Sequence, residues 1–104
     1  MNVLVLFRGR QPSQRLAAFA RRTLGFALDR FSDRIADILL RVRDDNGPRG
    51  GTDQHCSLAI QLVGGGDLHL QDVDASAERC VHRLARRAAR LIRKSSRRRK
   101  AMRR

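Results

Sequence analysis

The chain has 104 residues, 41% of them hydrophobic, and its 23 Lys and Arg against 10 Asp and Glu give a net charge of +13. This length allows one small domain, and no stretch approaches the roughly 20 apolar residues that a membrane span needs. The apolar run at residues 3–7 is followed by Arg8 and Arg10 and by no cleavage site, so we expect a cytoplasmic protein without a signal peptide.

The positive charge is confined to the end of the sequence. Residues 1–78 contain ten Arg and all ten acidic residues, so their formal charges cancel. Residues 79–104 contain the other thirteen Lys and Arg and no acidic residue. This excess is larger than solubility requires, and it indicates an anionic partner.

The first 43 residues alternate between strand and helix patterns. Residues 3–7 are apolar at every position, which is typical of a strand buried on both faces. Residues 13–31 repeat apolar side chains at helical spacing, and Pro12 or Ser13 lies near the expected N-cap. Residues 35–43 return to a period of two, which predicts a strand with Ile38, Leu40 and Val42 on its inner face.

The remaining sequence predicts a hairpin and a second helix. Residues 44–53 are rich in turn formers and predict a loop. Alternation over residues 55–62 predicts a strand, and Gly64 to Gly66 form the turn before a returning strand. Asp74 is the expected N-cap of the second helix. Seven positions at intervals of three and four form the apolar side of that helix: Ala77, Cys80, Val81, Leu84, Ala88, Leu91 and Ile92.

These elements predict an α+β fold of order β-α-β-β-β-α. A strand-helix-strand start implies a parallel pair of strands, and the later strands add to it in antiparallel fashion. We expect a four-stranded mixed sheet with two helices packed on one face. Residues 1–94 should form a single RNA-binding domain, and residues 95–104 a basic, disordered tail.

The side of the second helix that lies opposite its apolar positions is basic. Guanidinium groups bind phosphates in a bidentate manner and stack on bases, so structured RNA is the favoured partner. The alternatives are an anionic membrane, disfavoured because the apolar side must cover the sheet, and a solvated face without a partner. The expected RNA-binding residues are Arg79, Arg83, Arg86, Arg87, Arg90, Arg93 and Lys94 on the helix, Arg97 and Arg98 in the tail, and Arg49 in the loop.

No other chemistry is indicated. The central strands present no aromatic ring, so base stacking on the sheet face is excluded as the main mode of RNA binding. Cys56 and Cys80 both fall on apolar faces and are expected to be buried thiols. The spacing of the Cys, His and Asp residues fits no metal site, and no nucleophile-base pair or phosphate-binding glycine loop predicts an enzyme. We therefore expect no catalysis, cofactor or small-molecule substrate.

Three segments in this order of elements carry a resemblance: residues 31–35 (FSDRI), residues 46–51 (NGPRGG) with Asp53 and Cys56, and the glycine hairpin before residues 68–70 (LHL). Over about residues 1–94 the chain resembles the ribosome hibernation-promoting factor family, which includes ribosome-associated inhibitor A and is also called sigma-54 modulation protein. The resemblance implies a fold similar to double-stranded-RNA-binding domains. It also implies that the basic side of the second helix binds 16S-type rRNA in the mRNA/tRNA channel of the small ribosomal subunit, which blocks translation and preserves idle ribosomes.

The sequence departs from the family pattern in four places, the first being that only Glu78 remains of the acidic residues that the family often has along the second helix. Ser76 stands where the family often has Tyr, and Gln54 where a basic residue is common. No dimerisation domain follows residue 104, so a short form that is a monomer off the ribosome is the better match. Two other functions stay open: a general RNA- or DNA-binding module without a ribosomal site, and an RNA-processing enzyme or its accessory subunit.

Overall fold

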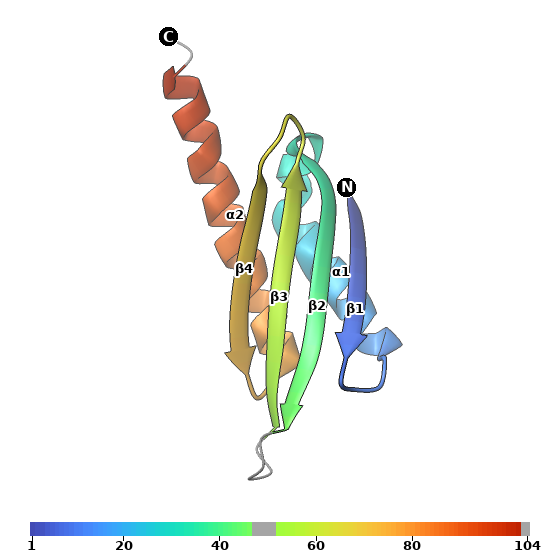
Figure 1. The fold of residues 1–104 in the computed structure, drawn as a ribbon. Coiled ribbons are helices and arrows are strands. Elements are labelled where there is room, and N and C mark those ends of the chain that lie inside the picture. The colour runs from blue at the N-terminus through green and yellow to red at the C-terminus, as the bar shows by residue number, and fades with distance from the viewer. Residues whose placement is uncertain (47–51, 103–104) are drawn as a thin grey trace.

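The computed structural model describes the backbone of residues 1–46 and 52–102 and the side chains of residues 1–44 and 53–95 (Figure 1). The element order β-α-β-β-β-α is confirmed. The elements are β1 (Asn2–Arg8), α1 (Gln14–Leu28), the short 3-10 helix η1 (Asp29–Arg34), β2 (Ile35–Asn46), β3 (Thr52–Leu62), β4 (Asp67–Asp74) and α2 (Ala77–Met102).

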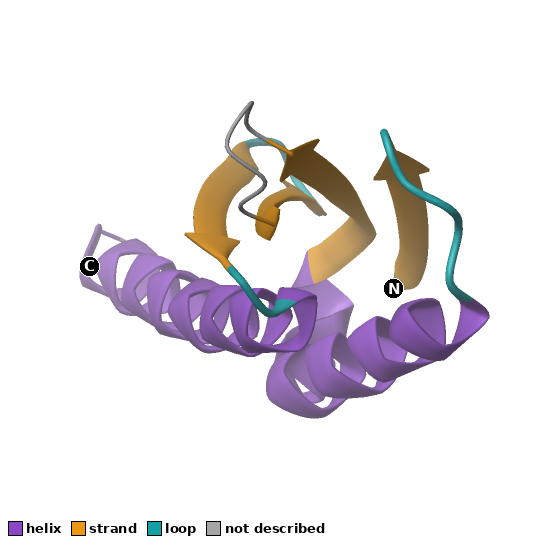
Figure 2. Ribbon diagram, turned by 90° about the horizontal axis from the view of Figure 1, so that it is seen from below, coloured by secondary structure: helices purple, strands orange, loops and turns teal. Residues whose placement is uncertain are grey.

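The four strands form one mixed sheet in the order β1-β2-β3-β4. β1 pairs with β2 in parallel, with Val3 opposite Ile38. β2 with β3, and β3 with β4, pair in antiparallel fashion. Both α-helices lie on the same side of the sheet, and both start from the same end of it (Figures 1 and 2). The predicted architecture is therefore confirmed.

The core lies between this side of the sheet and the two helices. The alternating residues of β2 and β3 that were predicted to face inward are buried, as shown by Leu40 and Ile60, which are 0% exposed. β1 differs from the prediction, because Leu4 is 54% exposed and Leu6 is 42% exposed. The helices cover only one side of the sheet, so every second residue of β1 faces outward although residues 3–7 are all apolar.

The helices begin with side-chain caps. The Oγ of Ser13 accepts a hydrogen bond from the backbone N–H of Leu16 at 3.1 Å, which confirms the predicted start of α1. α1 ends at Leu28, and the chain continues in η1 rather than in an α-helix to residue 31. α2 is capped by Ser76 and not by Asp74, since the Oγ of Ser76 accepts from the N–H of Arg79 at 3.3 Å.

Two further features of α2 differ from the sequence prediction. Leu91 is 39% exposed, whereas Ala85, which was not predicted to face the core, is 1% exposed. The backbone of α2 is helical to Met102, through most of the segment that was expected to be a disordered tail. Arg, Lys, Ala and Met, which dominate this segment, are strong helix formers.

The strands around the predicted loop are longer than expected. β2 runs to Asn46 and β3 starts at Thr52, so the residues at both ends of the predicted loop pair with each other, as Asp44 does with Gln54. Residues 47–51 between them, including Arg49, lie outside the described part of the chain.

Candidate nucleic-acid interface

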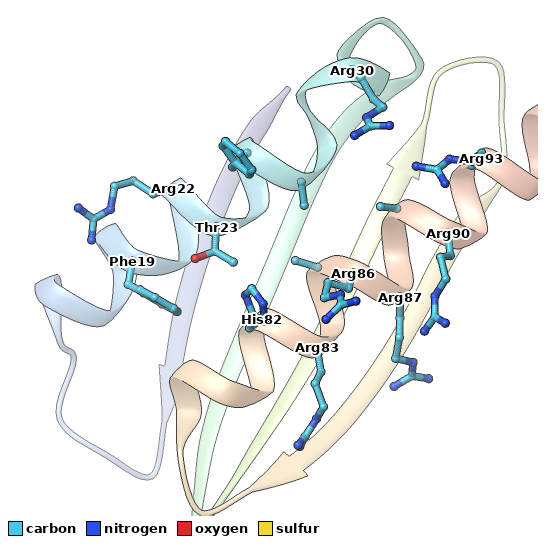
Figure 3. A pocket seen from close by; sticks show the side chains of 14 residues that line it. Phe19, Arg22, Thr23, Arg30, His82, Arg83, Arg86, Arg87, Arg90 and Arg93 are labelled. Carbon is cyan, nitrogen blue, oxygen red and sulfur yellow. The ribbon is translucent and has the colours of Figure 1, made fainter.

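The basic side of α2 divides into two rows that differ in their surroundings. At 3.6 residues per turn, Arg79, Arg83 and Arg87 follow one another at intervals of four and lie beside β4. Arg86, Arg90 and Arg93 line a groove between α2 and α1, and Arg93 points toward Arg30 (Figure 3). The sequence alone gives no reason to separate these residues. In the fold, however, Arg79, Arg83 and Arg87 contact β4.

The first row is bound to β4. Arg83 donates from Nε to Asp72 Oδ2 at 2.7 Å and from Nη1 to Asp74 Oδ2 at 2.9 Å. Arg79 lies 3.0 Å from Asp74 Oδ1 through its Nη2. Arg87 donates from Nη1 to the backbone carbonyl of Gln71 at 3.0 Å. We refer to these three arginines, with Asp72 and Asp74, as the β4 clamp.

The electrostatics of the β4 clamp agree with its geometry. The pKa of Asp74 falls to about 2, first because its carboxylate accepts the backbone N–H of Ser76 and then because it accepts from Arg79 and Arg83. The hydrogen bond from Arg83 also lowers the pKa of Asp72. Each carboxylate thus stays ionised and offsets charge on α2 throughout the neutral range.

The clamp corrects the expectation of an uncompensated basic helix. No acidic residue follows Arg79 in the sequence, but alternation along β4 places Asp72 and Asp74 on the side of the sheet that the helices cover. Their charges therefore meet the arginines of α2 across the fold.

The second row lines a groove between α1 and α2 (Figure 3). The groove has a volume of about 1030 Å³. Arg30 of η1 and Arg93 of α2 point toward one another across it, Arg22 of α1 and Arg86 and Arg90 of α2 also line it, and His82 lies toward the end where both helices begin. The lining of the groove also has apolar residues, which include Phe19, Ala85 and Ala89.

The groove carries positive charge that is only partly compensated, since of its lining arginines Arg83 is paired with Asp72 and Asp74. Its lining contains no Asp or Glu. Among residues with described side chains, no carboxylate forms an ion pair with Arg86, Arg90 or Arg93. Clefts lined by charge of one sign concentrate the field and attract the opposite ion. The geometry therefore suits a row of phosphates lying along the two helices.

The structure accounts for part of the predicted set. Arg83 and Arg87 belong to the clamp and also line the groove, Arg79 belongs to the clamp alone, and Lys94 is exposed on α2. The side chains of Arg97 and Arg98, like Arg49, lie outside the described residues. Arg22, Arg30 and Phe26 were not predicted. Their signal is present in the sequence, because positions 19, 22, 23, 26 and 30 fall on one side of a helix, but only the fold shows that this side faces α2.

The open side of the sheet has a different character. Arg8, Arg41 and Arg43 of β1 and β2 lie there beside His55 and Ser57 of β3, around a smaller hollow of about 210 Å³. Phe7, Phe19 and Phe31 pack against the core instead, and Phe26 is on α1. Among the described residues, no phenylalanine ring is therefore available on this side for stacking bases.

The two cysteines are buried in the core, as predicted. Cys80 donates from Sγ to the backbone carbonyl of Gln54 at 3.5 Å. Burial is the main cause that raises the pKa of both thiols, and that of Cys56 rises to about 12. Within the described residues, no group of three His, Cys, Asp or Glu side chains is arranged to hold a metal ion. The helices of the described chain include none that is long and apolar enough to cross a bilayer.

Comparison with known proteins gives a likeness of fold. No family model matches the chain, and no curated protein matches its sequence. Among solved structures, it resembles a ribosomal subunit interface protein from Coxiella burnetii, with a TM-score of 0.75 and 15% identity over 92% of this chain and 98% of that one. It also resembles the N-terminal domain of Protein Y from Thermus thermophilus, with a TM-score of 0.68 and 17% identity over 90% of this chain and 98% of that one. The chain therefore has the fold of these two proteins, in agreement with the resemblance noted in its sequence.

Proposed function

We propose that this chain is a non-catalytic ribosome-binding factor. It would occupy the mRNA/tRNA channel of the small ribosomal subunit, inhibit translation and preserve idle ribosomes. The observation that carries the proposal is the acid-free cationic groove between α1 and α2, on a fold shared with proteins described as a ribosomal subunit interface protein and Protein Y.

The groove suits helical or folded RNA in particular. Arginines on two neighbouring helices can contact phosphates on both sides of a strand, which fixes the orientation of the bound RNA. Such contacts recognise the shape of the backbone and not the sequence. Apart from its arginines, the lining of the groove contributes alanines and Phe19 and few polar groups that could read base edges.

The buried state of the thiols favours binding without catalysis. A nucleophilic cysteine needs an accessible thiolate, whereas the pKa of Cys56 is about 12 and its side chain is in the core. In this proposal the protein acts in the cytoplasm as a monomer and needs no cofactor. Arg86, Arg90 and Arg93 supply the main contacts, and Lys94, Arg97, Arg98 and Arg49 add further charge.

Sedimentation with purified ribosomal subunits tests the proposal. Wild-type protein should migrate with the small subunit at physiological salt, and the Arg86→Gln/Arg90→Gln/Arg93→Gln variant should not. A matched control, Arg8→Gln/Arg21→Gln/Arg41→Gln, removes the same formal charge from exposed positions outside the groove and should still bind. Equal binding by wild type and the groove variant would overturn the proposal.

A second measurement tests the site within the subunit. Chemical probing of 16S-type rRNA should show protections in the mRNA/tRNA channel with wild-type protein, and none there with the groove variant. If each of Arg22, Arg30, Arg86, Arg90 and Arg93 contacts one phosphate, the logarithmic salt slope should be roughly −3.5 to −4.5. Protections confined to other regions of the subunit would exclude the channel.

A general RNA-binding module is the second candidate. It is favoured by the same groove, whose cationic lining would attract any phosphate backbone. This candidate predicts equal affinity for both subunits and for unrelated structured RNA at each salt concentration. A preference for the small subunit that survives physiological salt would exclude it.

A further inference from the structure

Phe26 is an unusual residue for the exposed side of a helix. It is 92% exposed, more than any other large hydrophobic side chain in the described part of the chain. Isolated apolar residues on surfaces are common and need no explanation. Phe26, however, lies in the lining of the cationic groove, among arginines from both helices.

Two arginines of the groove lining flank Phe26 in the sequence. Arg22 precedes it by four residues on α1, and Arg30, in η1, follows it by four. The guanidinium of Arg30 lies over the ring of Phe31, 5.8 Å from its centroid. In the described residues, no arginine stacks on the ring of Phe26. Its ring is therefore accessible to a ligand.

We propose that Phe26 is a stacking platform for an unpaired nucleobase, in RNA whose phosphates lie along the groove arginines. The inference rests on the proposed RNA-binding function and adds a class of target to it. The bases of an A-form duplex are stacked inside the helix, so a base that reaches Phe26 must come from a single-stranded segment, a loop or a bulge. The groove would then hold a junction where a paired region opens.

A nucleobase fits this position better than an acidic peptide does. An apolar anchor of a peptide needs a concave pocket to receive it, whereas Phe26 is itself the projecting group. A base needs only an exposed ring face, together with positive charge for its phosphates, and the groove provides both.

Two substitutions at Phe26 separate stacking from simple apolar contact. Phe26→Leu retains apolar area without a ring, and Phe26→Ala removes both. With a single-stranded RNA oligonucleotide, stacking predicts roughly 5- to 100-fold weaker binding for both variants. The salt slope should stay unchanged because no charge is altered. Leu91→Ala, another exposed apolar position but outside the groove lining, is the matched control and should bind as wild type does.

A fluorescent variant reports on stacking directly. The chain has no Trp, so Phe26→Trp introduces a single indole. Its emission should be quenched by the RNA oligonucleotide, but not by inorganic polyphosphate or by an abasic oligonucleotide of the same length. Wild-type affinity in Phe26→Leu, or equal quenching by polyphosphate, would overturn the stacking platform.

The outcomes distinguish this inference from the function on which it rests. If Arg86→Gln/Arg90→Gln/Arg93→Gln loses RNA binding while both Phe26 variants keep it, only the stacking platform fails. If the arginine variant also keeps full binding, the proposed function fails with it. Because Phe26 is outside the core, neither substitution should change the melting temperature, which circular dichroism will check.

Discussion

Arg83 of α2 and Asp72 of β4 form a hydrogen-bonded ion pair in which Nε lies 2.7 Å from Oδ2 and Nη2 lies 3.2 Å from Oδ1. Two parallel N–H···O bonds of this kind fix the guanidinium in one plane. Arg83 also donates from Nη2 to the carbonyl of Val73 at 3.1 Å. Arg83 therefore joins α2 to the edge strand, and it cannot at the same time present its full charge to RNA.

The first prediction concerns the carboxylates of the β4 clamp. In Asp72→Asn/Asp74→Asn, the arginines lose their partners, so the melting temperature should fall. RNA should bind more tightly because two negative charges are lost and Arg79 and Arg83 become available. Each new phosphate contact should make the salt slope steeper by about 0.7–0.9. Melting curves and a salt titration measure both effects, and an unchanged melting temperature would contradict the clamp.

The second prediction concerns pH. The pKa of Asp74 is about 2 in the folded protein, whereas an unfolded Asp titrates near 3.9. Because the folded pKa is lowered, the stabilisation is fully present above about pH 4 and is lost as the pH falls toward 2. Wild type should therefore be more stable than Asp74→Asn at pH 6, and the difference should shrink between pH 4 and 2. If wild type were still more stable than Asp74→Asn by the same amount at pH 2, the stabilisation would come from packing and not from the charge of Asp74.

The third prediction separates the two rows of arginines. Arg83→Gln/Arg87→Gln breaks contacts with β4 and should lower stability. Arg86→Gln/Arg90→Gln removes the same charge and, like the first variant, relieves like-charge repulsion on the helix, but it breaks no β4 contact of the clamp, so it should raise stability by about 0.2–0.5 kcal/mol per pair at low salt. Urea denaturation of both variants measures the effect. A change of stability with the same sign in both variants would show that the two rows of arginines do not differ in their contribution to stability.

The sequence predicts the order of elements and the interior of the sheet well, because alternation with a period of two is a local property. Ile38, Leu58 and Ile60 could each be placed from their immediate neighbours, and all are buried. Where a helix or strand begins and ends depends less on the immediate neighbours in the sequence. Asp74 is a good capping residue by type, but α2 starts two residues later and Ser76 takes this role. Asp74 instead accepts the N–H of Ser76 and side chains of α2.

The candidate site could be only half predicted for a related reason. Basic residues on α2 are obvious in the sequence, but their partners depend on strand register and on how the helices pack. Asp72 lies eleven positions before Arg83 and meets it only because β4 runs beside α2. Arg22 and Phe26 belong to the part of the sequence whose formal charges cancel, and they join the site only because the two helices lie side by side.

The fourth prediction uses the buried thiols. Because the pKa of Cys56 is about 12 and its side chain is 1% exposed, alkylation by iodoacetamide at pH 8 should be far slower than that of a free thiol. Cys80 is 0% exposed and should be protected as well. Both thiols should react once urea unfolds the protein, so the rate of their alkylation reports how often the core opens. Rapid labelling of the folded protein would contradict the burial of these residues.

The parallel pairing of β1 with β2 also affects how the chain is synthesised. Val3 pairs with Ile38, so the first of the four strands has no partner until about 35 more residues have been made, which takes roughly 2–7 s at about 5–20 residues per second. During this interval the nascent chain carries the unpaired apolar segment Asn2–Arg8. Unpaired strands of this kind are prone to aggregate, so β1 carries this hazard until β2 has been made.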